Sequence, residues 1–279
     1  QALSQVQDGV YILTGSNTSP STQAAIDGFL NQYGNARHVV YDAVSYSAIL
    51  DAHEQTHGVR TLPRYRFDQA EVIVGVEADF LGTWISPVEF TKGYIQGRTL
   101  EGDSPKLSHH AQFEGRMSLT GSNADHRVPI MTGESATILR MLAERLAERA
   151  GTTMSQLANI SGSAGVGTDV LDDLTDRLWQ ARGRSLVVCG INDVGIQCLV
   201  NAINQLLDNY GNTLDLERPS NQWKSDDRAM QDLLEAMRSG SVNALLIAGT
   251  NPAYSLPDAQ AFTEATRQVP LTVTFTEYQ

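Results

Sequence analysis

Short apolar runs alternate along the chain with longer segments whose apolar residues recur at helical spacing. The apolar runs cover residues 9–15, 38–43, 70–75, 184–190 and 243–249. The helical patterns cover residues 19–34, 132–150, 170–181, 196–210 and 226–240. Unbroken apolar runs are typical of parallel strands buried on both faces, and alternation with helices covers both faces of such a sheet. The pattern predicts an α/β fold of three layers, with Rossmann-like units and parallel sheets.

Residues 83–130 interrupt this alternation. The segment is rich in Gly, Ser, Pro and His and shows no clear period. A loose stretch of this length inside a compact domain is usually functional or packs against another element. We also expect "GSAGVG" at 162–167 to be a loop, because no strand precedes it and no dinucleotide fingerprint opens any of the helices.

Three of the apolar runs end on glycine followed two residues later by asparagine, and a fourth ends on glycine alone. In parallel α/β sheets ligands bind outside the carboxyl ends of the strands, where glycine allows close backbone approach and asparagine both donates and accepts hydrogen bonds. The same residues also make ordinary turns and helix entries. The candidate ligand-binding residues, retained or vestigial, are Gly15, Ser16, Asn17, Gly75, Glu77, Gly190, Asn192, Gly249, Thr250, Asn251 and Pro252.

Composition narrows the classes of partner. The chain has 279 residues, 20 Lys and Arg against 32 Asp and Glu, and a net charge of −12. Such a surface repels phosphate backbones and anionic lipid, which argues against nucleic acid and membrane-surface partners. No apolar run approaches the roughly 20 residues that span a bilayer. The sequence opens on Gln1 and ends on a strand-like run, so we expect an excised piece of a longer chain.

The two cysteines, Cys189 and Cys198, match no zinc or iron–sulfur spacing. Cys189 ends an apolar run and is expected to be a small buried core residue. We do not expect a disulfide.

Three longer stretches resemble the molybdopterin oxidoreductase family, which includes formate dehydrogenases and dimethyl sulfoxide reductases. They are "GRSLVVCGINDVGIQCLVNAINQLLDNYGNTLDL", "LLEAMRSGSVNALLIAGTNPAYSLPDAQAFTEA" and "YRFDQAEVIVGVEADFLGTWISPV". The second carries the family's G-x-N-P turn at a cofactor-binding strand end. "HEQTHGVRTLPRYRFDQAEVIVGVEADFLGTWISP" and "RMSLTGSNADHRVPI" look like the molybdopterin-like iron–sulfur subunit of bacterial alternative complex III.

The resemblance implies two intertwined units, with residues 1–37 and 184–279 in the first and residues 38–183 in the second. It implies a domain of a quinol-oxidising respiratory complex, with membrane-bound partner subunits and a periplasmic location reached by Tat-type export. In relatives, or in other parts of the parent chain, it implies molybdopterin guanine dinucleotide and 4Fe-4S clusters.

The sequence departs from the family where the cofactor chemistry is concentrated. The only residues near the family's metal-ligand position are Ser45 and Ser47, and the cluster-binding cysteines are missing from this chain. In the first G-x-N-P position Glu77 and Ala78 replace Asn and Pro, and Asp79 follows. Both carboxylates would stand beside the pyrophosphate of the cofactor. Like charges about 4 Å apart at an effective dielectric near 20 repel by roughly 4 kcal/mol, which would lower the affinity for the cofactor about a thousandfold. We therefore expect no catalytic residue and no cofactor in this fragment, which would act as a scaffold.

Two alternatives stay open. One is an active molybdenum oxidoreductase that binds its cofactor at the glycine-terminated strand ends. The other is a zinc hydrolase, because "HEQTH" places His53 and His57 on one face of a helix with Glu54 as a general base, and Glu77 could be a third ligand. Against zinc, Gly58 ends the helix and the metzincin extension is missing.

The remaining polar residues are expected to have structural roles. His109 and His110 are interpreted as loop residues, and Glu114 as a solvated loop charge. His126 and Arg127 lie in a loop near the same crevice and could neutralise an anion.

Overall fold

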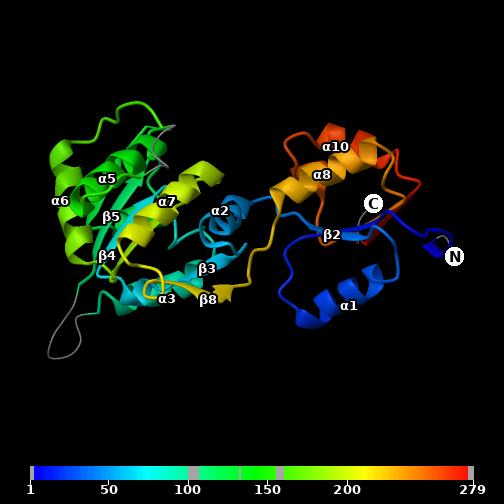
Figure 1. Ribbon diagram of the computed structural model, residues 1–279, viewed down its shortest axis with the longest axis horizontal. Coiled ribbons are helices and arrows are strands. Elements are labelled where there is room, and N and C mark those ends of the chain that lie inside the picture. The colour runs from blue at the N-terminus through cyan, green and yellow to red at the C-terminus, as the bar shows by residue number, and fades with distance from the viewer. Residues whose placement is uncertain (1–2, 100–106, 132, 155–159, 276–279) are drawn as a thin grey trace. The chain divides into compact units, whose positions relative to one another are not determined.

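A computed structural model describes residues 3–99, 107–131, 133–154 and 160–275, and it divides the chain into two units (Figure 1). The first unit combines Gln1–Ser47 with Asn221–Gln279, and the second is Ala48–Ser220. Each unit has its own four-stranded parallel sheet with helices on both faces. The α/β fold class predicted from the alternation of strands and helices is therefore confirmed.

In the first unit the parallel strands follow the order β10-β9-β1-β2. Because β1 pairs with β9, strands from the two ends of the chain are neighbours at the centre of the sheet. The elements are η1 (Leu3–Gln5), β1 (Val10–Thr14), α1 (Pro20–Leu30), β2 (Arg37–Val40), α8 (Asp227–Arg238), β9 (Ala244–Ala248), α9 (Pro252–Ser255), α10 (Ala259–Thr266) and β10 (Leu271–Phe275).

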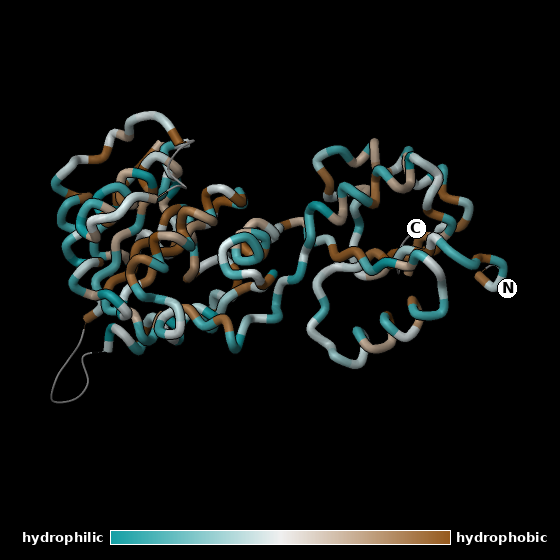
Figure 2. The backbone as a smooth tube through the Cα atoms, in the orientation of Figure 1, coloured by the Kyte–Doolittle hydropathy of each residue, from teal (hydrophilic) through white to brown (hydrophobic). Residues whose placement is uncertain are grey.

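Strand alternation divides the first unit's core into two layers. Tyr11 and Leu13 on β1 face the apolar side chains of α8 and α10. Val10 and Ile12 face the other way, toward α1. The helices α1 and α8 accordingly lie on opposite sides of the sheet in Figure 1, and apolar residues run along the strands between them in Figure 2.

In the second unit the parallel strands follow the order β6-β5-β4-β7, and β3 pairs with β8 in a separate antiparallel ribbon. The elements are α2 (Ser47–His57), β3 (Leu62–Tyr65), η2 (Phe67–Gln69), β4 (Val72–Val76), α3 (Pro87–Gln96), β5 (His109–Glu114), α4 (Leu119–Asn123), β6 (His126–Pro129), α5 (Ser135–Ala150), α6 (Thr168–Gln180), β7 (Ser185–Cys189), α7 (Val194–Leu206) and β8 (Leu214–Ser220).

The two faces of the second sheet carry different side chains. One face packs its aliphatic residues against α5, α6 and α7, and this core includes the buried Cys189. The other face carries aromatic residues, among them Phe80 and Tyr94, whose rings both contact the ring of His110 on β5. The second sheet is thus enclosed on both sides, as its unbroken apolar strands predict.

The boundaries between the units differ from those implied by the resemblance. Residues 184–220 lie in the second unit, because β7 pairs with β4 along its whole length. Residues 38–47 lie in the first unit, because β2 pairs with β1. The two ends of the chain do share one unit, but the chain passes from one unit to the other at residues 47–48 and 220–221.

The prediction of a loose segment over 83–130 is wrong. The described part of that segment contains α3, β5, α4 and β6. The sequence pattern did not predict β5 because the residues on one of its two buried faces, His110, Gln112 and Glu114, are polar. A search for apolar runs misses a strand whose buried side chains are polar and satisfied by hydrogen bonds.

Within the described residues no helix is both long and apolar enough to cross a membrane.

Candidate functional site

The first unit brings two of the sequence-predicted residues together at the carboxyl edge of its sheet. Gly15 follows β1 and Gly249 follows β9, and the pairing of these strands makes them neighbours. A Cβ atom on Gly15 would lie 3.4 Å from both the Gly249 carbonyl and Asp42 Oδ1. Gly249 has φ +68°, in the left-handed region that favours glycine.

Asp42 already occupies the hydrogen-bond donors at this edge. Its Oδ1 accepts from the Ser16 amide at 2.8 Å and its Oδ2 accepts from the Ser16 hydroxyl at 2.5 Å. The Ser16 hydroxyl also accepts from the Lys224 amide at 2.7 Å. A carboxylate of the chain therefore takes the two donors that a phosphate oxygen would need.

The other candidates in this unit have structural contacts. Asn17 Oδ1 accepts from the Ser19 amide at 3.0 Å, which forms the turn that leads into α1. Thr250 donates to the Tyr41 carbonyl at 3.4 Å. Asn251 and Pro252 begin α9, a helix of four residues, and the Asn251 side chain does not cap it.

In the second unit Gly190 is required by close contact between strands. A Cβ atom there would lie 2.1 Å from the Glu77 carbonyl oxygen, which is backbone and cannot move aside. Glu77 itself has φ +53°, an uncommon conformation for a residue with a side chain. Gly75 likewise admits the buried Gln112, whose Oε1 would be 2.0 Å from an added Cβ.

Three carboxylates occupy the carboxyl edge of this second sheet. Glu77 Oε1 accepts from the Gly115 amide at 2.9 Å. Asp79 Oδ1 accepts from the amide and the hydroxyl of Thr120, at 3.1 and 2.8 Å. Glu114 accepts from Ser118 and from Arg127. Each carboxylate thus uses donors of the loops that surround the strand ends.

Glu114 is the most deeply buried of the three, with a side chain only 2% exposed. The Arg127 guanidinium donates to its Oε1 at 2.6 Å and the Ser118 hydroxyl donates to its Oε2 at 2.5 Å. Burial alone would raise the pKa of Glu114, but the hydrogen bonds from Ser118 and Arg127 hold this pKa below its usual value. The interpretation of Glu114 as a solvated charge is therefore wrong, and Arg127 neutralises a carboxylate of its own chain.

Asn192 is also used locally. Its Oδ1 accepts from the Ala48 amide at 3.0 Å, in the first turn of α2.

These two edges do not fit a pyrophosphate group. In the first, Asp42 takes the nearby amide and hydroxyl of Ser16, and in the second, Glu77, Asp79 and Glu114 accept the hydrogen bonds of the surrounding loops. Additional negative charge beside buried carboxylates raises the energy steeply at low dielectric.

The histidines of "HEQTH" lie on one face of α2, with ring centroids 5.5 Å apart. His53 is buried, its Nδ1 lies 2.7 Å from the Ile49 carbonyl, and its Nε2 lies 3.2 Å from the Tyr210 hydroxyl. Burial lowers the pKa of His53 to about 4. Both ring nitrogens are hydrogen-bonded, and no group of three His, Cys, Asp or Glu residues in the described ranges could hold a metal ion. The geometry gives the zinc alternative no support.

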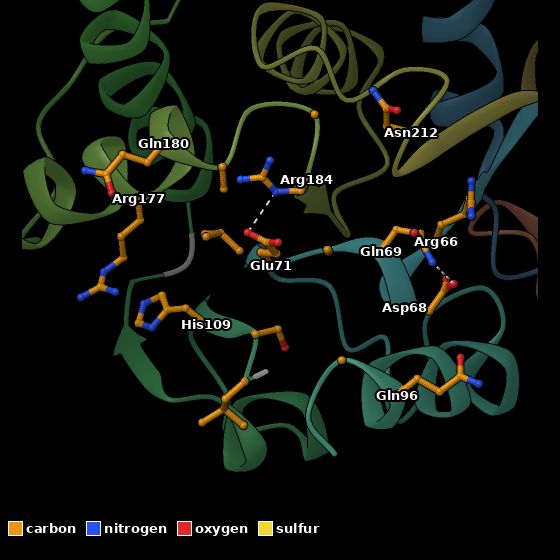
Figure 3. Close-up of a pocket in the computed structure, with 17 residues that line it drawn as sticks. Arg66, Asp68, Gln69, Glu71, Gln96, His109, Arg177, Gln180, Arg184 and Asn212 are labelled. Carbon is orange, nitrogen blue, oxygen red and sulfur yellow. Dashed lines mark hydrogen bonds and ion pairs between the residues drawn. The ribbon is translucent and has the colours of Figure 1, made fainter. Parts of the chain in front are cut away.

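A cavity of the second unit lies at the opposite, amino-terminal edge of its sheet (Figure 3). Its volume is about 870 Å³. The first residues of β4, β5 and the segment before β7 line it, together with the ends of α3 and α6. The polar lining residues are Arg66, Asp68, Gln69, Glu71, Gln96, Ser108, His109, Arg177, Gln180, Arg184 and Asn212.

Two polar atoms in this cavity lack a partner. Ser108 is 4% exposed, and in the described part of the chain neither its buried hydroxyl nor the buried Nε2 of His109 has a hydrogen-bond partner. Unsatisfied buried polar atoms are rare in folded proteins. No sequence pattern indicated this site, because its residues come from five separate stretches of the chain and carry no common motif.

No protein-family model matches the chain, and no curated protein matches its sequence. Two solved structures share its fold. Acetylene hydratase from Pelobacter acetylenicus has a TM-score of 0.60 and 11% identity, over 95% of this chain and 46% of that one. A chain of the formyltransferase/hydrolase complex from Methylorubrum extorquens, solved with methylofuran, has a TM-score of 0.57 and 14% identity, over 97% of this chain and 75% of that one.

At these identities the likeness establishes a shared fold alone. This chain spans less than half the length of the acetylene hydratase chain.

Proposed function

We propose that this chain is a cofactor-free scaffold domain with the molybdopterin oxidoreductase fold, within a multi-subunit quinol-oxidising assembly. The observation that carries the proposal is the use of the strand-end donors by the chain's own carboxylates, Asp42 in the first unit and Glu77, Asp79 and Glu114 in the second. Because these carboxylates are held by hydrogen bonds, the proposal assigns them no catalytic role. The same hydrogen bonds give the loops a fixed shape that a partner protein can recognise.

The fold comparisons support the proposal only in its general part. The chain that matches over 75% of its length belongs to a formyltransferase/hydrolase complex, so this fold does occur within a larger assembly. The quinol donor, the periplasmic location and the 4Fe-4S clusters rest on the sequence resemblance.

The cofactor part is tested by producing the chain in a host that makes molybdopterin guanine dinucleotide. Molybdenum and tungsten are measured by mass spectrometry, and the pterin by fluorescence after oxidation. We expect neither above the level of a matched non-binding protein. About one metal and one pterin per chain would overturn the proposal and favour the active oxidoreductase.

A second measurement tests the strand-end donors directly, without relying on a cofactor that survives purification. The chain is titrated with guanosine diphosphate, which carries the pyrophosphate of the family's cofactor, while the amide signals of Ser16 and Gly115 are followed by NMR. We expect no saturable shift. Saturation of either signal would show that the strand-end donors are available to a ligand.

The assembly part is tested in the source membranes with an epitope-tagged parent chain. The tagged protein should comigrate with quinol oxidase activity after mild solubilisation. Recovery of all that activity in fractions without the chain would contradict the proposal.

A further inference from the structure

The two parallel sheets have four edge strands, β2, β10, β6 and β7, and the chain itself protects three of these edges. An unprotected edge strand offers backbone groups that can pair with a strand of another chain. On β7 the side chain of Asn204 takes the place of a further strand. Its Oδ1 accepts from the Val187 amide at 3.1 Å, and its Nδ2 donates to the Val187 carbonyl at 2.8 Å. Because Gln197 also donates to the Cys189 carbonyl at 3.0 Å, β7 offers few free backbone groups to a partner.

The edges at β6 and β2 are protected in other ways. Pro129 on β6 has no backbone amide to donate, and His126 and Arg127 on the same strand have polar or charged side chains. On β2 the Asp226 amide donates to the Val40 carbonyl at 2.9 Å. Proline, charge and an existing backbone hydrogen bond each discourage the addition of a further strand.

The edge at β10 has none of these features. Within the described residues β10 pairs with β9 alone, and no other hydrogen bond reaches it. Its sequence, LTVTF, contains no charge and no proline, and threonine, valine and phenylalanine all favour strands. Thr272, Thr274 and Phe275 are exposed, while Leu271 and Val273 are only partly buried. The strand β10 is thus an open and uncharged edge.

The five residues of β10 are also complementary to themselves. When two copies of the strand pair in antiparallel fashion about Val273, Leu271 of each copy lies opposite Phe275 of the other, and Thr272 lies opposite Thr274. Aromatic–aliphatic and Thr–Thr pairs of this kind stabilise antiparallel strands. Successive side chains point to opposite faces, so the apolar residues of both copies share one face of the joined sheet and the threonines share the other.

The apolar layer beside β10 is incompletely covered. Among the described residues, the fully buried members of this layer lie on β1 and β9, and no residue of α1, the helix on this face, is buried. Phe275 at the end of β10 is 63% exposed. A second copy beside β10 brings Phe275 of each copy against Leu271 of the other and removes apolar surface from water.

We propose that two copies of this chain form a dimer by antiparallel pairing of their β10 strands about a two-fold axis at Val273. A two-fold contact needs only one self-complementary surface. Because β10 is uncharged, two chains of net charge −12 meet there without like charges in the strand contact. The two four-stranded sheets then form one continuous sheet. This inference is independent of the proposed scaffold role.

The first test measures the mass of the chain by sedimentation equilibrium over a wide range of concentrations, where we expect reversible dimers. Thr272→Lys combined with Thr274→Lys places lysine opposite lysine in both threonine pairs and should weaken the dimer Kd at least about tenfold. The control combines Thr152→Lys with Thr153→Lys, at two exposed threonines of the second unit, and should dimerise as the wild type does. Unchanged far-ultraviolet circular dichroism checks that both variants fold.

The second test reports the register by disulfide formation, in a Cys198→Ser background because Cys198 is partly exposed. Directly opposite residues of antiparallel strands have Cα atoms about 4.5–5.5 Å apart, which suits a disulfide. Of the five positions, 273 is the one that lies opposite itself, so Val273→Cys should form a linked dimer under mild oxidation. Thr272→Cys should not link to itself, but it should link to Thr274→Cys when the two variants are mixed.

Reversible dimers that the β10 lysines weaken and the control lysines do not, with disulfides in this register, would support the proposal. A monomer at every concentration would overturn it, and so would equal weakening by the control lysines. Self-linkage of Thr272→Cys as efficient as that of Val273→Cys would also overturn it, because the strands would then not pair about Val273.

Discussion

The two edges of the second sheet differ in how their polar groups are satisfied. At the carboxyl edge every carboxylate named above accepts hydrogen bonds from neighbouring loops. At the amino edge Ser108 and His109 retain atoms without a partner in the described residues, beside an open cavity. At the edge where this fold class usually binds ligands, the polar groups are therefore satisfied by the chain itself, and the unsatisfied polar atoms lie buried at the opposite edge.

The difference shows that the position of a site follows from unsatisfied groups rather than from the fold. Saturated polar networks stabilise one conformation and leave nothing for a ligand. Unsatisfied groups lower stability slightly and gain free energy when a ligand arrives. A substitution that removes a hydrogen-bonded group should thus destabilise the fold, and one that removes an unsatisfied group should not.

The largest effect is expected from Gly190→Ala at the carboxyl edge. The new methyl group would overlap the Glu77 carbonyl, so the strand end must shift, at a cost of at least about 3 kcal/mol. Urea unfolding followed by fluorescence measures the loss. The control Gly28→Ala lies within α1, where an added Cβ meets nothing within 4 Å, and should stabilise that helix by up to about 1 kcal/mol. Similar unfolding curves for the two variants would contradict the close contact.

The acid stability of the second unit gives the next effect. Burial lowers the pKa of His110 to about 4, and His53 has the same lowered value. Between about pH 6.5 and 4 the unfolded chain binds protons that the folded chain does not, so stability falls on the order of 3 kcal/mol for each histidine. His110→Gln should remove about half of this dependence. An unchanged slope of unfolding free energy against pH would contradict it.

Glu114→Gln should cost about 2 kcal/mol, because charge-assisted hydrogen bonds to a buried carboxylate are lost. The lowered pKa of Glu114 means that its contribution is present above about pH 4.5 and is lost as the pH falls through the folded value. The variant should therefore approach the wild type in stability once the pH has fallen below the folded-state pKa of Glu114. The control Glu144→Gln breaks an exposed helical ion pair and should cost less than about 0.5 kcal/mol.

The smallest effect has the opposite sign. Ser108→Ala at the amino edge removes an unsatisfied hydroxyl and should leave stability unchanged or raise it by up to about 1 kcal/mol. Ser185→Ala, at the same edge, removes a buried hydroxyl that donates to Asn209 at 3.0 Å, and should cost about 1 kcal/mol. Equal losses in the two variants would mean that Ser108 is satisfied in solution.

The fold was predictable where side chains are uniformly apolar. The runs at 9–15, 70–75, 184–190 and 243–249 correspond to β1, β4, β7 and β9, with ends displaced by a residue or so. The buried state of Cys189 was also predicted from its run. The strand β5 was not predictable, since His110 and Gln112 are buried with hydrogen bonds that only the folded neighbours provide.

The candidate site was predictable only in part. Glycines at strand ends indicated where Gly15 and Gly249, and Gly75 and Gly190, would lie at the edges of two sheets. Sequence could not show that Asp42 and Glu114 fill those edges, because no pattern of residue types indicates that Ser16 donates to Asp42 or that Ser118 and Arg127 donate to Glu114. Whether these glycines serve any ligand stays a prediction, and the amino-edge cavity had no local pattern at all.

The central pairing of β1 with β9 also fixes an order of events on the ribosome. All strands of the second unit lie between these two in the sequence, so its parallel sheet can close while the C-terminal part of the first is still being made. At a synthesis rate of about 5–20 residues per second, β9 is made roughly 10–50 s after β1. During that time β1 can pair with β2, but its other edge, which pairs with β9, stays open, and this makes nascent β1 a target for chaperones or for aggregation.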